Sequence, residues 1–125
     1  MLCQATRQKS FPIENSEWDA FPWKDIPSEL IQNHMGKKPD HFPKAEVKIV
    51  YDNMAVCVMF QVRDRYVRAT AASHQAEVYK DSCVEFFFTP GPDVSKGYFN
   101  LEMTTPSHLA YYDSSDGRQD PRAVN

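Results

Sequence analysis

The chain has 125 residues, of which 42% are hydrophobic and 25% are charged, and its net charge is −3. This length and composition suit one globular domain with a hydrophobic core of its own. The acidic balance excludes a general basic surface for nucleic acid, and no basic amphipathic stretch suits a membrane surface. A neutral polar partner such as a sugar needs no net charge.

Residues 1–44 contain five of the nine prolines. Because proline fixes φ and removes a backbone donor, we predict an irregular, mostly extended N-terminal segment without a long helix or a central strand. Residues 27–36, "PSELIQNHMG", predict one short helix that starts near Pro27 and ends near Gly36. The large apolar residues expected to pin this segment to the core are Trp18, Phe21, Trp23 and Ile26.

From Ala45 onward, apolar and polar residues alternate with a period of two. This pattern in residues 46–51 and 54–64, separated by the turn-forming pair Asp52 and Asn53, predicts a β-hairpin. Residues 66–73 suggest an edge or a loop. Further strands are predicted in residues 82–90, 97–105 and 108–113.

Consecutive antiparallel strands with short turns predict an all-β fold, an antiparallel β-sandwich. We expect a single domain, with residues 45–112 as its core strands and the polar residues 113–125 as a loop or tail. Five or so strands leave the edges of the sheets unpaired. We therefore expect the fold to be incomplete and the chain to form a homodimer through these open edges. The expected core residues are Val56, Val58, Phe60, Val84, Phe86, Phe88, Phe99 and Leu101.

The three cysteines, Cys3, Cys57 and Cys83, include no CxxC pair, which argues against a disulfide framework or a zinc site. A bridge between Cys57 and Cys83 requires neighbouring strands, and a free buried thiol is the commoner state. Residues 1–14 hold no apolar run that suits a signal peptide or a membrane helix. The compartment is therefore left open by the residues alone.

Carboxylates alternate with core formers in "VYKDSCVEFFFTP", residues 78–90. Residues two apart share one face of a strand, so Val84, Phe86 and Phe88 are expected in the core. The opposite face would carry Glu85, which we expect to lie near Asn100 or Glu102 of the next strand, roughly 5 Å away across the ladder. Such a face can bind a sugar through acceptors and rings, although exposed sheet faces are ordinarily polar. The full set assigned to this face is Tyr79, Asp81, Cys83, Glu85, Phe87, Tyr98, Asn100 and Glu102.

The block "DSCVEFFFTP" followed by "GYFNLEMTT" resembles the family 9 carbohydrate-binding modules, within the DOMON-like β-sandwich superfamily. "EVKIVYD" and "VMFQVRDRYVRA" support the resemblance, which covers residues 16–112. It implies a jelly-roll-like sandwich that binds sugars or polysaccharide chain ends without hydrolysing them, outside the cell or in the periplasm.

The resemblance also implies site residues. Tyr79 corresponds to the first of two rings that clamp the sugar, and Glu85 to the glutamate that binds its hydroxyls. Asn100, Glu102 and Arg118 are further candidates, whereas the second ring comes from late in the family domain and has no match here. A structural calcium ion would draw on oxygen ligands from Asp52, Asp64 and Asp81.

Other chemistry stays open at this stage. A glycosidase needs two carboxyl groups about 5–9.5 Å apart, which Glu85 and Glu102 could provide. Some DOMON-like domains hold haem by methionine and histidine, but this cofactor is the less expected one here. The third alternative is an interaction domain without a sugar site. The haem ligand pairs that can be proposed are Met59 with His108 and Met103 with His74.

Overall fold

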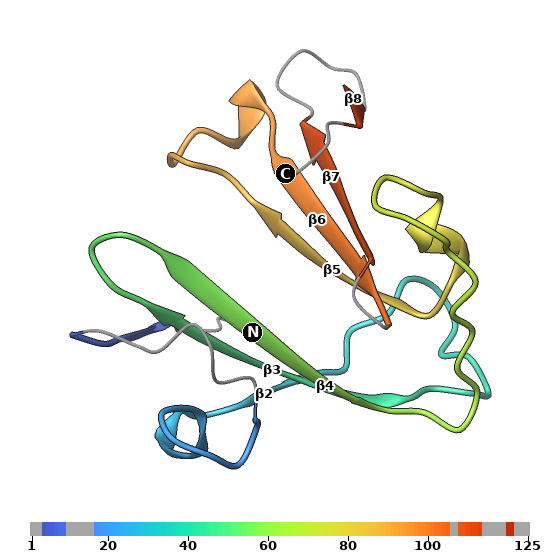
Figure 1. Ribbon diagram of the computed structural model, residues 1–125, viewed down its shortest axis with the longest axis horizontal. Coiled ribbons are helices and arrows are strands. Elements are labelled where there is room, and N and C mark those ends of the chain that lie inside the picture. The colour runs from blue at the N-terminus through green and yellow to red at the C-terminus, as the bar shows by residue number, and fades with distance from the viewer. Residues whose placement is uncertain (1–3, 10–16, 106–107, 114–119, 122–125) are drawn as a thin grey trace. The chain divides into compact units, whose positions relative to one another are not determined.

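The computed structural model describes residues 4–9, 17–105, 108–113 and 120–121. In these ranges, eight strands form two four-stranded sheets, and every helix is a single 3₁₀ turn (Figure 1). The prediction of an all-β, sandwich-type fold is therefore confirmed. None of the described helices is long and apolar enough to cross a membrane. The elements are β1 (Thr6–Arg7), η1 (Trp23–Asp25), β2 (Glu29–Ile31), β3 (Lys44–Tyr51), β4 (Val56–Arg63), η2 (Val78–Lys80), β5 (Cys83–Phe88), η3 (Val94–Lys96), β6 (Phe99–Thr104), β7 (His108–Asp113) and β8 (Asp120–Pro121).

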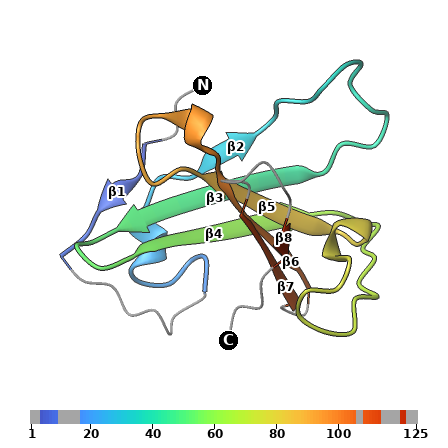
Figure 2. The ribbon, with the colours of Figure 1, turned by 90° about the horizontal axis from the view of Figure 1, so that it is seen from above.

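The chain divides after Arg65 into two compact units, which each contain one sheet. In the first unit, β3 and β4 form the predicted hairpin, paired from Lys44 opposite Arg63 to Tyr51 opposite Val56. Since β4 occupies one whole edge of β3, β1 and β2 share the other edge, as Figure 2 shows. The β1–β3 pairing is parallel, so the sheet is not purely antiparallel as predicted.

The predicted helix in residues 27–36 is wrong. Residues Glu29–Ile31 form β2, which pairs antiparallel with β3 from Glu29 opposite Val47 to Ile31 opposite Ala45. Backbone hydrogen bonding to an existing strand edge therefore outweighs the local signals of Pro27 and Gly36, which favoured a helix.

The proline-rich N-terminal segment packs on the first sheet through a small apolar cluster. Trp23, Ile26 and Val50 are buried together, with Cys57 and Met59 against them. These two β4 residues lie on the face that the alternation had assigned away from the core. Phe21, which was expected to pin the segment, is instead 64% exposed.

Lys48 lies beneath this segment and is only 5% exposed. Its ammonium donates to the backbone carbonyls of Trp18 and Trp23, at 3.1 and 2.8 Å, and lies 4.2 Å from the centroid of the Trp18 ring. Because a buried ammonium must be hydrogen-bonded, these contacts fix the segment over the sheet.

The second unit contains the sheet β5-β6-β7-β8, in which every neighbouring pair is antiparallel. The strands predicted at 82–90, 97–105 and 108–113 correspond to β5, β6 and β7. Gly97, with φ of 101°, ends η3 and leads the chain into β6. Among the described residues β4 and β5 each pair along one edge only, and pairing with a second copy through these edges stays a prediction.

The apolar face of the second sheet is the predicted one, but its side chains are less buried than expected. Phe88 stacks on Phe86 and on Phe99, with ring centroids 5.6 and 5.2 Å apart, yet it remains 37% exposed. In the first sheet Val56 is 59% exposed. The other expected core residues, Val58, Phe60, Val84, Phe86, Phe99 and Leu101, are half-buried. Among the described residues, the apolar side chains buried most deeply are Trp23, Ile26, Val47, Val50 and Val78.

Candidate functional site

The opposite, polar face of the second sheet brings together the two predicted glutamates. Glu85 on β5 lies directly opposite Glu102 on β6, and Phe87 lies opposite Asn100. Directly opposite residues share a face, with Cβ atoms about 4.5–5.5 Å apart. Of the two neighbours expected for Glu85, Asn100 or Glu102, the ladder therefore places Glu102 directly opposite.

Two polar residues of this face are buried, although the sequence predicted a solvent-exposed sheet surface. Asn100 and Glu102 are 4% and 7% exposed, whereas Glu85 is exposed. The 3₁₀ turn η2, the yellow coil on the segment leading into β5 in Figure 1, lies against β5, β6 and β7. Its Val78 is fully buried, which anchors the turn to the sheet.

Two buried acceptor oxygens on this face are unsatisfied. Asn100 Nδ2 donates to Glu102 Oε1 at 2.9 Å, but Asn100 Oδ1 and Glu102 Oε2 have no hydrogen-bond partner in the described part of the chain. Burial raises the pKa of Glu102 and the Glu85 carboxylate raises it further, while the bond from Asn100 lowers it. An orphaned buried acceptor is costly, so these two atoms suit a ligand that brings donors.

Tyr79 lies on η2, before β5 begins, whereas the sequence analysis assigned it to a face of the strand. Its ring is 53% exposed, and its hydroxyl donates to Glu77 Oε1 at 2.9 Å. This bond raises the pKa of Tyr79, and the Glu102 charge contributes to the shift in the same direction. Tyr79 is therefore an exposed aromatic residue on η2, the turn that lies against the sheet carrying Glu102.

Asp81 also precedes the strand, and its role is structural. Its carboxylate accepts from the Thr70 and Ala71 backbone N–H groups, both at 2.7 Å, from the Thr70 hydroxyl at 2.8 Å and from Arg68 Nε at 3.3 Å. These donors, the Ala71 N–H foremost, lower the pKa of Asp81. The side chain, 1% exposed, thus ties residues 68–71 to the start of β5.

Sequence reasoning placed Phe87 and Tyr98 on this face but named neither among the individual site residues. Phe87 is 52% exposed and Tyr98 39%, and their ring centroids lie 5.5 Å apart at 55°. An exposed phenylalanine in a strand next to Asn100 is a signal that could have marked a second aromatic surface. The face therefore carries exposed rings as well as buried acceptors.

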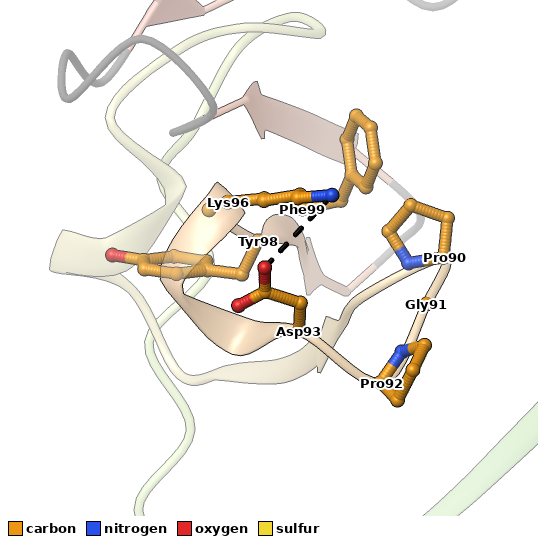
Figure 3. A pocket seen from close by; sticks show the side chains of 8 residues that line it. Pro90, Gly91, Pro92, Asp93, Lys96, Tyr98 and Phe99 are labelled. Atoms are coloured by element: carbon orange, nitrogen blue, oxygen red, sulfur yellow. Dashed lines mark ion pairs between the residues drawn. The ribbon is translucent and has the colours of Figure 1, made fainter.

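A hollow of about 290 Å³ lies in the β5–β6 connection (Figure 3). Its walls are largely the carbons of Pro90, Pro92 and Phe99. Lys96 and Asp93 form a 3.9 Å ion pair, and Asp93 Oδ1 accepts from the Ser95 hydroxyl at 2.6 Å. Since its charged groups are already paired, this hollow is a poorer sugar site than the polar face. Its full lining is Pro90, Gly91, Pro92, Asp93, Lys96, Gly97, Tyr98 and Phe99.

The aspartates proposed for calcium have separate partners. Asp52 Oδ1 accepts from the N–H groups of Met54 and Ala55 in the β3–β4 turn, and Asp64 Oδ1 lies 2.8 Å from His41 Nε2. No group of three or more His, Cys, Asp or Glu side chains that could hold a metal ion occurs within the described ranges. Asp52, Asp64 and Asp81 are therefore not brought together, and calcium stays an expectation from the resemblance.

The remaining proposed residues are the haem-ligand candidates, Arg118 and the two cysteines Cys57 and Cys83. Met59 packs against the Trp23 cluster, and Met103 lies opposite Val84 on the apolar face. Arg118 and the side chain of His108 lie outside the described residues, and haem binding is untested. Cys57 and Cys83 are free thiols in different units, so the bridge considered between them is absent. Burial raises the pKa of Cys83.

This face of the second sheet thus combines unsatisfied buried acceptors, which can take hydrogen bonds from hydroxyls, with exposed rings, which can pack on apolar C–H surfaces. The sequence model of carbohydrate-binding family 9 matches residues 23–121, well over half of the chain. The chain therefore belongs to this family, and the resemblance drawn from its motifs is confirmed.

A solved structure supports the same fold. The crystal structure of a Bacteroides uniformis protein that is proposed to bind carbohydrate superposes with a TM-score of 0.79 at 20% sequence identity. The alignment covers 95% of this chain and 55% of that protein, so the chain spans about half of its length. No curated protein matches the sequence.

Proposed function

We propose that this protein binds carbohydrate, without hydrolysing it, on the polar face of the second sheet. The observation that carries the proposal is the pair of buried, unpartnered acceptors, Asn100 Oδ1 and Glu102 Oε2. Sugar hydroxyls are donors that can satisfy both atoms, and Glu85 opposite Glu102 adds an accessible carboxylate. Membership of carbohydrate-binding family 9 supports this ligand class.

The rings would supply the apolar half of the contact. A pyranose presents a C–H face that packs on an aromatic ring, and Tyr79, 53% exposed, lies on η2 against the sheet that carries Glu102. Phe87 adds a second exposed ring opposite Asn100. With rings on only one side of the sugar, we expect a dissociation constant of roughly 10 μM to 1 mM, which corresponds to a binding free energy of about −4 to −7 kcal/mol.

Glycan-array screening followed by titration calorimetry tests the proposal. Glu85→Ala should weaken binding at least about tenfold, because an accessible acceptor is lost while the exposed side chain contributes little to the fold. Tyr79→Ala should weaken it by roughly threefold to tenfold. Glu29→Ala, on β2 of the first unit, is the matched control and should bind like the wild type.

Incubation of the best ligand with the protein should release no new reducing ends. Failure of the wild type to bind any mono- or oligosaccharide at millimolar concentration would contradict the proposal. Release of products that is lost in the Glu85 variant would instead establish a glycosidase.

A further inference from the structure

The chemistry of the polar face is one-sided, because both of its buried atoms that lack a partner are acceptors. Asn100 Oδ1 and Glu102 Oε2 are buried without partners in the described part of the chain. The Asn100 amide donates within the face, to Glu102 Oε1. Glu85, opposite Glu102 across the ladder, adds a third acceptor group. A ligand that fits here must bring several donors to a small volume.

The face also carries uncompensated negative charge. Two cations of the second unit are already engaged with other carboxylates: Lys80 lies 2.7 Å from Glu77 and Arg68 lies 3.3 Å from Asp81. Neither Glu85 nor Glu102 forms an ion pair with any side chain that the structure describes. Two carboxylates opposite each other repel, so a cation between them would be favoured.

We propose that the preferred ligand is an amino sugar with a free amine, whose ammonium group lies among Asn100 Oδ1, Glu102 Oε2 and the Glu85 carboxylate. This inference rests on the proposed sugar-binding function and names the class of sugar. A primary ammonium has three N–H donors and no acceptor, which matches three acceptor groups. The exposed rings of Tyr79 and Phe87 are suited to the C–H face of the same sugar.

Competing sugars fit this arrangement less well. A hydroxyl donates one hydrogen bond and carries no charge, whereas hydrogen bonds from an ammonium to a carboxylate are charge-assisted and roughly twice as strong. An N-acetyl group replaces the ammonium by one neutral N–H and adds a carbonyl acceptor. A uronic acid would bring a third carboxylate to Glu85 and Glu102. We therefore expect amino sugars to bind more tightly than neutral, N-acetylated or acidic ones.

Titration calorimetry with glucosamine and its β-1,4 oligomers, against glucose and cello-oligosaccharides of equal length, tests the inference. At about pH 6.5, where an amine with a pKa like that of an α-amino group is protonated, the amino sugar should bind about tenfold more tightly. Glu102→Gln removes the charge with little change in shape and should reduce this preference to about threefold or less. Glu29→Gln should leave the preference unchanged.

The outcomes separate this inference from the function on which it rests. Binding of the neutral sugar as tightly as the amino sugar, or more tightly, would overturn the inference and leave sugar binding intact. An unchanged preference in a folded Glu102→Gln protein would also overturn it, because the charge would then lie elsewhere. Failure of both sugar types to bind would overturn the proposed function and this inference with it.

Discussion

Glu102→Gln should stabilise the protein at neutral pH while it weakens ligand binding. In the wild type, Glu102 is 7% exposed, its Oε2 has no partner among the described residues, and Glu85 lies opposite. The glutamine side chain keeps Oε1 for the bond from Asn100. It replaces the orphaned oxygen by a donor that can reach Asn100 Oδ1 or Glu85. Removal of one buried unsatisfied acceptor is worth about 1 kcal/mol, or roughly 3–6 °C in Tm for a chain of this size.

The pH dependence of this gain follows from the raised pKa of Glu102. A folded-state pKa above the unfolded value means that the protonated form stabilises the fold. That contribution is fully present below the unfolded pKa, about 4.3, and is lost as the pH rises through the folded pKa. The variant and the wild type should therefore be equally stable near pH 4, and the advantage of the variant should appear as the pH rises to 7.

Urea unfolding from pH 4 to pH 7 measures this difference, with Glu29→Gln as the control for loss of a negative charge. A Glu102→Gln protein that is 1 kcal/mol or more less stable than the wild type at pH 7 would refute the reasoning. It would show that the carboxylate is stabilised by a partner and is not an orphaned acceptor awaiting a ligand.

Three further changes test the fold. Trp23→Ala should lower the free energy of unfolding, measured with urea, by about 3–5 kcal/mol, because it leaves a cavity in the cluster with Ile26 and Val50. A loss below about 1 kcal/mol would show that the cluster is dispensable. Asp81→Asn should flatten the acid end of the stability profile. Because the pKa of Asp81 is lowered in the folded protein, its ionised carboxylate stabilises the fold at pH values above the unfolded-state pKa of about 3.9. That stabilisation is lost as the pH falls through the folded-state pKa, and an unchanged stability profile in the variant would contradict this. Asp52→Ala should lower the free energy of unfolding by about 1 kcal/mol, since the N–H groups of Met54 and Ala55 lose their acceptor. An unchanged unfolding midpoint would show that these hydrogen bonds do not stabilise the β3–β4 turn.

The long strands and the residues that share a face could be predicted from the sequence, because alternation over six or more residues is a local property. Two such runs joined by a short connection placed Glu85 near Asn100 or Glu102, and the β5–β6 ladder pairs it with Glu102. Two-residue periodicity also assigned Phe87 and Asn100 to the same face.

Features that depend on contacts between distant segments could not be predicted. Lys48 alternates with apolar residues and therefore suggests an exposed position, yet it is buried because Trp18 and Trp23 bring backbone carbonyls to it. Asp81 resembles a face residue or a calcium ligand, but donors from residues 68–71 occupy its carboxylate. Asn100 and Glu102 were expected on an exposed surface, yet they are buried, and the 3₁₀ turn η2 lies against their sheet.

The central claim, that carbohydrate binds on the polar face of the second sheet, is tested most directly by an NMR titration of the ¹⁵N-labelled protein with sugar. The side-chain amide of Asn100 reports on the buried acceptors, and the Trp23 indole in the first unit is an internal control. We predict saturable shifts of the Asn100 side chain and of backbone amides in Cys83–Phe88 and Phe99–Thr104, with the Trp23 indole unmoved. Shifts confined to the first unit or to the hollow at residues 90–98, with Asn100 unchanged at saturation, would contradict the account.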